Sequence, residues 1–169
     1  PEGKLPVTFY RSTDELPAFT DYSMKNRTYR YMQSEALYPF GYGLSYTDFT
    51  YSDVKASAEK VGADGVDITA TVTNSGKTAG TETVQVYVKV CREGTPNAQL
   101  KGIRKVALAA GESKTVTLHL PKEALGVFDE NGELQVNGEV KVYVGGQAPD
   151  TRSAKLTGKT VTELTLSIA

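Results

Sequence analysis

The sequence predicts an all-β protein, an antiparallel β-sandwich preceded by an extended amino-terminal segment. Three observations support this prediction. From residue 47 onward apolar and polar residues alternate, which is the period of a strand with one buried face. Residues that favour turns separate the alternating stretches. Before residue 47 neither the strand period nor the helix period is sustained, and seven of the ten tyrosines lie between Tyr22 and Tyr51.

Length and charge restrict the classes of function. A chain of 169 residues suits one domain with an attached segment. The formal net charge of -1 gives no electrostatic reason to expect a nucleic acid or an anionic membrane as partner. No apolar run reaches the roughly 18–20 residues needed to span a bilayer.

The amino-terminal segment, residues 1–46, reads neither as a helix nor as a solvated linker. Pro6, Pro17 and Pro39 interrupt any helix that could form there. Tyrosine rings bury large areas when they pack. We therefore expect the segment to lie along a surface, much of it belonging to another domain.

The strands of the predicted sandwich follow in chain order. The alternation is clearest in residues 66–73, 84–90, 115–120 and 140–144, and each stretch has one apolar and one polar face. Glycine and asparagine mark turns at residues 62–65, 74–76, 110–112, 131–132 and 137–138. Residues 121–125 predict a single helical turn, and no other segment predicts a helix of useful length. About seven short strands of this kind predict an immunoglobulin-like sandwich.

The cysteine and tryptophan content narrows the type of sandwich. The chain has one cysteine and no tryptophan, so the Cys…Trp…Cys pattern of antibody domains is absent. A fibronectin type III-like sandwich is the better description. Cys91 has no partner for an internal disulfide, and we expect it to be a structural residue at the end of a strand.

Several motifs resemble those of one enzyme family. The stretch Leu37-Tyr-Pro-Phe-Gly-Tyr-Gly-Leu-Ser-Tyr46 resembles the passage into the last domain of family 3 glycoside hydrolases. Residues 3–10 are similar to the final strand of that family's α/β sandwich domain, and residues 21–22 and 27–31 to the crossing segment that follows. Downstream, Val72-Thr-Asn-Ser-Gly76, Val84-Gln-Val-Tyr-Val88, Gln99-Leu-Lys-Gly102 and Ala110-Gly-Glu112 continue the resemblance in order.

The resemblance implies a domain organisation and a function. Residues 1–13 would be the tail of the α/β sandwich domain, residues 14–46 a tyrosine-rich interdomain segment, and residues 47–169 a fibronectin type III-like β-sandwich. The chain would be the non-catalytic C-terminal module of a retaining β-glucosidase or β-xylosidase, which is secreted or periplasmic in the cases that the resemblance favours. The nucleophile and acid would lie in the barrel and α/β sandwich domains, so we expect no catalytic residue, cofactor or metal here.

The same resemblance places six aromatic side chains at a domain boundary. We expect them to dock the module onto the catalytic barrel and α/β sandwich domains, through which an oligosaccharide substrate would be bound. These residues are Phe9, Tyr10, Tyr29, Tyr31, Phe40 and Tyr42.

The alternative function is a stand-alone carbohydrate-binding or adhesion module. The basic and aromatic cluster at Lys25, Arg27 and Tyr29–Tyr31 could stack on sugars, or it could anchor the segment to its neighbour. Only Tyr87 and Tyr143 alternate onto the outer face, which is little for a binding platform. His119 is predicted on a polar face as a surface residue, and residues 129–132 are predicted as a hairpin turn rather than a calcium loop.

Overall fold

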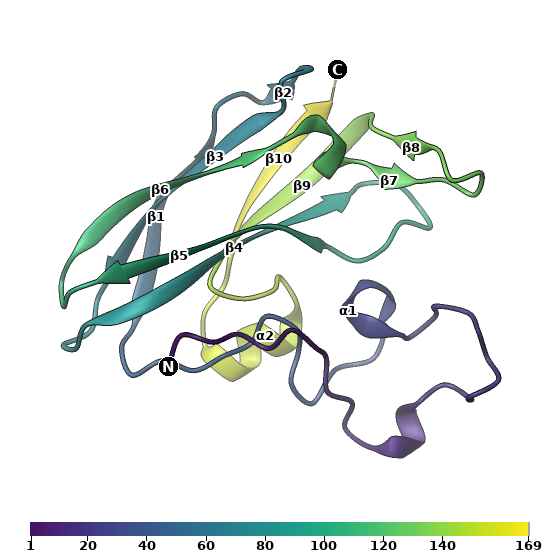
Figure 1. The fold of residues 1–169 in the computed structure, drawn as a ribbon, viewed down its shortest axis with the longest axis horizontal. Coiled ribbons are helices and arrows are strands. Elements are labelled where there is room, and N and C mark those ends of the chain that lie inside the picture. The colour runs from purple at the N-terminus through teal and green to yellow at the C-terminus, as the bar shows by residue number, and fades with distance from the viewer. Residues whose placement is uncertain (169) are drawn as a thin grey trace.

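The computed structural model describes residues 1–168, and over this range the chain forms a β-sandwich flanked by an amino-terminal segment (Figure 1). Its strands are β1 (Phe49–Ala56), β2 (Lys60–Val61), β3 (Val66–Asn74), β4 (Gly80–Val90), β5 (Gln99–Leu108), β6 (Ser113–Leu120), β7 (Val127–Phe128), β8 (Leu134–Gln135), β9 (Gly138–Gly145) and β10 (Thr162–Ile168). Its helices are η1 (Thr13–Glu15), α1 (Thr28–Tyr31), η2 (Lys122–Leu125) and α2 (Thr151–Thr157).

The strands form two facing sheets and one small hairpin. One sheet has the order β1-β3-β6, and the other has the order β2-β10-β9-β4-β5. All pairings are antiparallel except that of β2 with β10. The hairpin β7-β8 extends from one end of the sandwich (Figure 1). The predicted fold class is therefore confirmed.

The core lies between the two sheets and is formed by the alternating apolar residues of both. Within each sheet, these residues are neighbours on adjacent strands. Ile68 of β3 pairs in register with Leu118 of β6, and Val86 of β4 pairs with Val144 of β9. All four side chains are buried. The strand period in the sequence therefore marks the core-facing side correctly in each of the four stretches from which the sandwich was predicted. In β4 the opposite side, predicted to face solvent, is buried as well.

The strand count also agrees with the prediction. Seven strands have seven or more residues, and the remaining three, β2, β7 and β8, have two residues each. The predicted turn at residues 129–132 joins β7 to β8, where the carboxylate of Asp129 accepts hydrogen bonds from the backbone N–H groups of Asn131 and Glu133. The predicted helical turn near residue 121 is η2, for which Pro121 is the N-cap.

The expectation of no other helix was wrong. Helix α2 spans Thr151–Thr157 between β9 and β10, and α1 adds a single turn within the amino-terminal segment. The sequence contained the end signals of α2. The Asp150 carboxylate caps its first turn by accepting from the Ser153 N–H, and Gly158 ends it in the left-handed conformation at φ 68°. No helix of residues 1–168 is long and apolar enough to cross a membrane.

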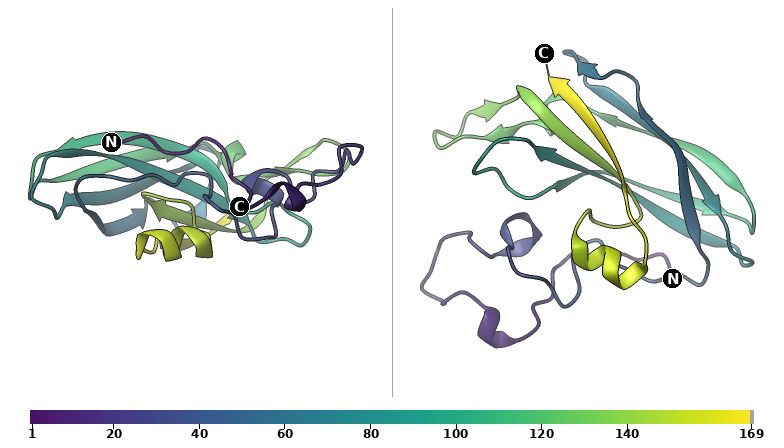
Figure 2. Two further views of the ribbon diagram at one scale, coloured as in Figure 1. Left: turned by 90° about the horizontal axis from the view of Figure 1, so that it is seen from below. Right: turned by 180° about the vertical axis from the view of Figure 1, so that it is seen from behind.

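Residues 1–46, called the strap below, run along the sandwich and extend beyond it (Figure 2). Two stretches of the strap pair with each other. Leu5 donates its N–H to the Tyr42 carbonyl at 2.8 Å, and Phe9 donates to the Tyr38 carbonyl at 2.9 Å. Residues 10–37 therefore form one long loop, called the excursion, whose two ends lie side by side.

Candidate functional site

The strap covers the outer face of the five-stranded sheet at β4. The Thr83 hydroxyl donates to the Glu2 carbonyl at 2.9 Å, and the Gln85 side-chain amide donates to the carbonyls of Gly41 and Gly146, each at 3.0 Å. Both side chains point away from the sandwich core and are nevertheless buried. The alternation in the sequence predicts this face of β4 in solvent, whereas in the structure it is an internal interface with the strap.

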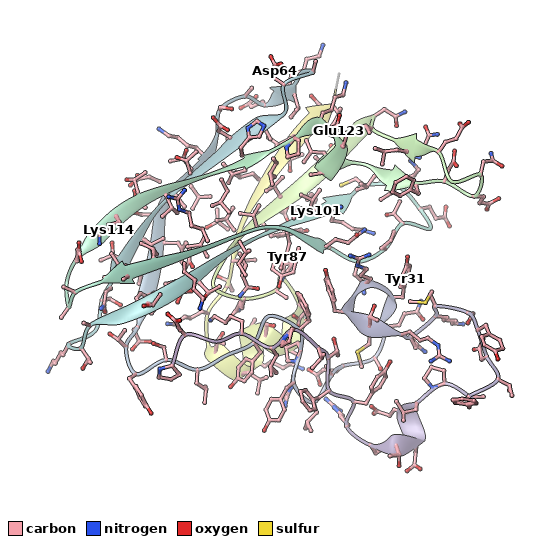
Figure 3. The ribbon with its side chains drawn as sticks, viewed as in Figure 1. Tyr31, Asp64, Tyr87, Lys101, Lys114 and Glu123 are labelled. Carbon is pink, nitrogen blue, oxygen red and sulfur yellow. The ribbon has the colours of Figure 1, made fainter. Side chains whose placement is uncertain are left out.

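An aromatic cluster holds the strap at this interface. The rings of Tyr29 and Phe40 stack with centroids 4.0 Å apart, and both meet the ring of Tyr87 edge to face at 6.4 Å. The side chain of Tyr87 on β4 points toward the strap in Figure 3. Its hydroxyl donates to the Gln85 side-chain oxygen at 2.6 Å, and burial raises the pKa of Tyr87 well above its ordinary value. Edge-to-face and stacked ring pairs add stability beyond their buried area.

Gly41 permits the close approach of strap and sheet. Its φ is +79°, and a Cβ at this position would lie 2.4 Å from the Tyr87 hydroxyl oxygen and 2.5 Å from the Gln85 side-chain oxygen. Only a glycine fits here without displacing both side chains.

The loop between β4 and β5 holds helix α1. Asn97 donates its backbone N–H to the Arg30 carbonyl at 2.7 Å, and its side-chain amide donates to the carbonyls of Tyr29 and Met32. Tyr29 is fixed further because its hydroxyl accepts the N–H of Leu100 at 3.1 Å. The strap therefore contacts the rest of the chain at β4 and at the loop before β5, and it also contacts β5 through Glu2 and Lys105 and helix α2 through Glu35 and Lys155.

A second set of aromatic rings faces outward from the strap. Phe9 and Tyr38 meet edge to face at 6.4 Å, and Tyr38 stacks on Tyr42 with centroids 5.8 Å apart. Phe9 is 46% exposed and Tyr38 43% exposed. Rings that contact one another and remain partly in water form an apolar surface of the kind used for protein contacts.

Two clefts border the strap. One, of about 670 Å³, lies between the strap, the loop before β5 and helix α2, and it is lined by Tyr29, Phe40, Lys89, Tyr143 and Arg152 among others. The second, of about 610 Å³, has Glu82 and Tyr51 in its wall and Lys4 and Lys159 nearby. The Tyr51 hydroxyl donates to the Glu82 carboxylate at 2.9 Å, and burial raises the pKa of that carboxyl.

The six predicted docking residues divide into two groups. Tyr29 and Phe40 pack on the chain's own sandwich through Tyr87. Phe9 is exposed, whereas Tyr10, Tyr31 and Tyr42 are half-buried. The hydroxyl of Tyr10 donates to the Asn26 carbonyl at 2.5 Å.

Other residues at this interface were missed from the sequence. Gln85 and Thr83 alternate onto the polar face, so the strand period predicted them in solvent. Tyr38 lies between two predicted docking positions, and the aromatic-rich sequence around it was a signal that could have identified it.

Apart from Glu82, the acidic side chains of residues 1–168 are exposed or half-buried. Glu82 is the one buried carboxyl of this range, whereas retaining glycosidases use two carboxyls about 5 Å apart. No group of three potential metal ligands occurs among the described residues. His119 is exposed on the outer face of β6, with its Nδ1 2.7 Å from the Asp67 carboxylate, as expected for a surface histidine.

Cys91 lies one residue beyond β4 and is exposed. Desolvation and the neighbouring Glu139 raise the pKa of its thiol. The thiol is therefore held in its protonated, less nucleophilic form.

Comparison with known proteins agrees with this architecture. Residues 82–148 match the fibronectin type III-like domain family. A xylan 1,4-β-xylosidase of Xylanibacter ruminicola is 40% identical over 160 residues, which cover 93% of this chain and 18% of that protein. A periplasmic β-glucosidase of Salmonella typhimurium is 37% identical over 161 residues, which cover 86% of this chain and 21% of that protein.

Solved structures show the same relationship. A family 3 β-glucosidase of Bifidobacterium adolescentis superposes with a TM-score of 0.79 at 33% identity, over 98% of this chain and 26% of that one. A β-glucosidase of Erythrobacter marinus superposes with a TM-score of 0.78 at 31% identity, over 100% of this chain and 22% of that one. The chain spans about a fifth of the length of the curated relatives it matches.

The fold and its covered outer face define a fibronectin type III-like β-sandwich module. The similarity to family 3 glycoside hydrolases extends over nearly the whole chain but covers only about a fifth to a quarter of their length, which is consistent with a C-terminal module of such an enzyme.

Proposed function

We propose that this module is part of a β-glucosidase or β-xylosidase and that its strap docks it onto the catalytic domains. The observation that supports this proposal is the outward-facing aromatic surface of Phe9, Tyr38 and Tyr42 on a strap whose other side packs on the sandwich. The relatives are several times longer than this chain, so a large partner surface would be present in the same polypeptide.

The two sides of the strap would have different tasks. Tyr29 and Phe40 fix the strap on β4, and the outward rings then meet the partner in one set orientation. Tyr10 and Tyr31 are half-buried within the excursion of residues 10–37 and complete the proposed docking set with Phe9 and Tyr42. The strap could thereby orient the module relative to the catalytic domains without ordering new segments, which reduces the entropic cost of association.

The chemistry would lie in the catalytic domains. A retaining β-glycosidase uses a nucleophilic carboxylate and a carboxylic acid on opposite sides of the scissile bond. The names of the relatives indicate β-linked glucose or xylose as the sugar. Residues 1–13 would complete the α/β sandwich domain in this arrangement.

The test uses the full-length enzyme. We expect Phe9→Ser to lower the temperature midpoint of unfolding by at least about 2 °C, because it places a polar group in the docked interface. The matched control is Phe128→Ser on the β7-β8 hairpin, an exposed phenylalanine away from the strap, which should change the midpoint by less than about 1 °C. Equal midpoints for the two variants would contradict docking through the strap.

A second measurement separates the module from the chemistry. The purified 169-residue chain should show no turnover of aryl β-glucosides or aryl β-xylosides, while the full-length enzyme hydrolyses at least one of them. Turnover by the purified chain that scales with its concentration would show that the module is itself catalytic.

A further inference from the structure

Residues 18–27, called the Arg27 loop below, form a structured projection at the far end of the strap. Three backbone contacts close it: Asp21 N–H to the Ala18 carbonyl, Arg27 N–H to the Met24 carbonyl, and Asn26 N–H to the Tyr31 carbonyl, at 2.9, 2.9 and 3.2 Å. The Asp21 carboxylate adds a local turn by accepting the Ser23 N–H at 2.8 Å.

The guanidinium of Arg27 organises this loop from within. Its Nε donates to the Ser23 carbonyl at 3.0 Å, and one terminal nitrogen donates to the carbonyls of Asp21 and Ala18 at 2.5 and 3.3 Å. A planar guanidinium with several donors in fixed directions can satisfy three carbonyls at once, which an ammonium on a flexible chain does less well. Arg27 is thus occupied inside the loop.

The loop presents apolar side chains to solvent. Phe19 is 96% exposed and Tyr22 is 91% exposed, and Met24 is exposed beside them. These rings therefore gain almost no burial from residues 1–168, although the backbone that carries them is fixed by the contacts above. An aromatic side chain on a pre-ordered backbone is well suited to act as an anchor in a partner's pocket, because little conformational entropy is lost on binding.

We propose that the Arg27 loop inserts Phe19 and Tyr22 into an apolar recess of the catalytic part of the same polypeptide, and that Arg27 is the positioning residue for this contact. The inference rests on the proposed docking function and extends it to a second, separate contact. The occupant is assigned to the same polypeptide for two reasons. The loop is carried on the excursion that starts and ends at the outward surface of Phe9 and Tyr38, and the relatives contain several times more chain than this module.

The surface of this chain's own sandwich that contacts the strap is already covered by other residues of the strap. The strap reaches the sandwich through Tyr29, Phe40 and the contacts of Asn97, all outside residues 18–26. Figures 1 and 2 show residues 18–27 extending away from both sheets. The sandwich therefore does not cover Phe19 or Tyr22.

The test measures thiol labelling in the full-length enzyme. Phe19→Cys is introduced in a Cys91→Ser background, and its labelling rate is read by peptide mass spectrometry against the rate in the denatured protein. Phe128→Cys, in the same background, is the matched control because Phe128 is 72% exposed and lies on the β7-β8 hairpin. We expect Phe19→Cys to be labelled at least about ten-fold more slowly than Phe128→Cys, which corresponds to about 1.4 kcal/mol of protection.

Arg27→Lys tests the positioning role. The lysine keeps the charge but loses the fork that holds three carbonyls, so the protection of Phe19→Cys should fall by at least about five-fold. Arg30→Lys on α1 is the matched control and should leave the protection unchanged. Protection that survives Arg27→Lys would overturn the positioning role.

Two further outcomes would overturn the proposed contact. Phe19→Cys labelled as fast as Phe128→Cys would show that the loop stays in water, and protection that disappears on dilution would assign it to a second copy of the protein. Phe9→Cys, measured in parallel, separates the two proposals. If Phe9→Cys is protected and Phe19→Cys is not, the Arg27 loop contact fails while docking through the strap stands. If both are labelled freely, docking itself fails.

Discussion

The sandwich and the strap are stabilised in different ways. In the sandwich, long strands pair along their whole length and apolar residues of both sheets meet in one continuous core. In the strap, separate contacts carry the attachment: a ring cluster around Tyr87, the hydrogen bond from Gln85 to Gly41, the contacts of Asn97, and exposed ion pairs from Glu2 and Glu35. A sandwich substitution should therefore affect unfolding of the whole module, and a strap substitution should affect the attachment of one segment.

The first prediction concerns the sandwich and has the largest expected effect. Ile68→Ala should lower the free energy of unfolding by about 2–5 kcal/mol, because Ile68 is fully buried between the sheets and its loss leaves a cavity. Urea denaturation followed by circular dichroism measures this change. Thr69→Ala, on the outer face of the same strand, is the matched control and should cost less than about 1 kcal/mol. Comparable costs at positions 68 and 69 would show that β3 does not have one buried face.

The second prediction concerns the strap. Gly41→Ala should detach the strap locally, at a cost of about 1–3 kcal/mol, because its Cβ would collide with Tyr87 and Gln85 and because φ is positive at this residue. The expected observation is faster amide exchange in residues 37–42 with little change in β3 and β6. Gly62→Ala is the matched control, since nothing lies within 4 Å of its added Cβ. Faster exchange throughout β3 and β6 in Gly41→Ala would mean that strap and sandwich unfold together.

This contrast also explains what could be predicted from the sequence. The strand period identified β3, β4, β6 and β9 because residues such as Ile68 and Val86 reveal their burial through their immediate neighbours. Helix α2 was missed although Asp150 and Gly158 mark its ends, because its seven residues are too few to show a helical period.

The strap interface could be predicted only in part. The density of aromatic residues indicated a buried segment, and the stacking of Tyr29 on Phe40 agrees with that. Gln85 is buried because it contacts Gly41, which lies 44 positions away in the sequence. The alternation of apolar and polar residues along a strand cannot indicate a contact of that kind. The predicted role of the six aromatic residues in docking to another domain stays a prediction, which the full-length enzyme can test.

The third prediction has the smallest effect and concerns Glu82, which lies where the strap meets the sandwich. Burial raises the pKa of Glu82 above its ordinary value of 4.5, while Lys4, Tyr51 and Lys159 act in the opposite direction. The folded module therefore holds a proton on Glu82 at pH values at which the unfolded chain has released it. The contribution of Glu82 to stability must then fall as the pH rises from 4.5 toward the folded pKa, by at most about 1.4 kcal/mol per pH unit.

Glu82→Gln should remove that fall, because the amide does not ionise and can still accept the Tyr51 hydroxyl. The free energy of unfolding, measured at intervals from about pH 4 to about pH 7, should therefore rise for the variant relative to the wild type as the pH increases. Glu163→Gln is the matched control: the hydrogen bond from Lys141 lowers the pKa of Glu163, so its stabilising contribution is present above pH 4.5 and is lost as the pH falls below it. A difference between wild type and Glu82→Gln that stays constant over the whole range would mean that Glu82 ionises in the folded module as readily as in water. The strap would then not shield the Glu82 carboxyl from solvent.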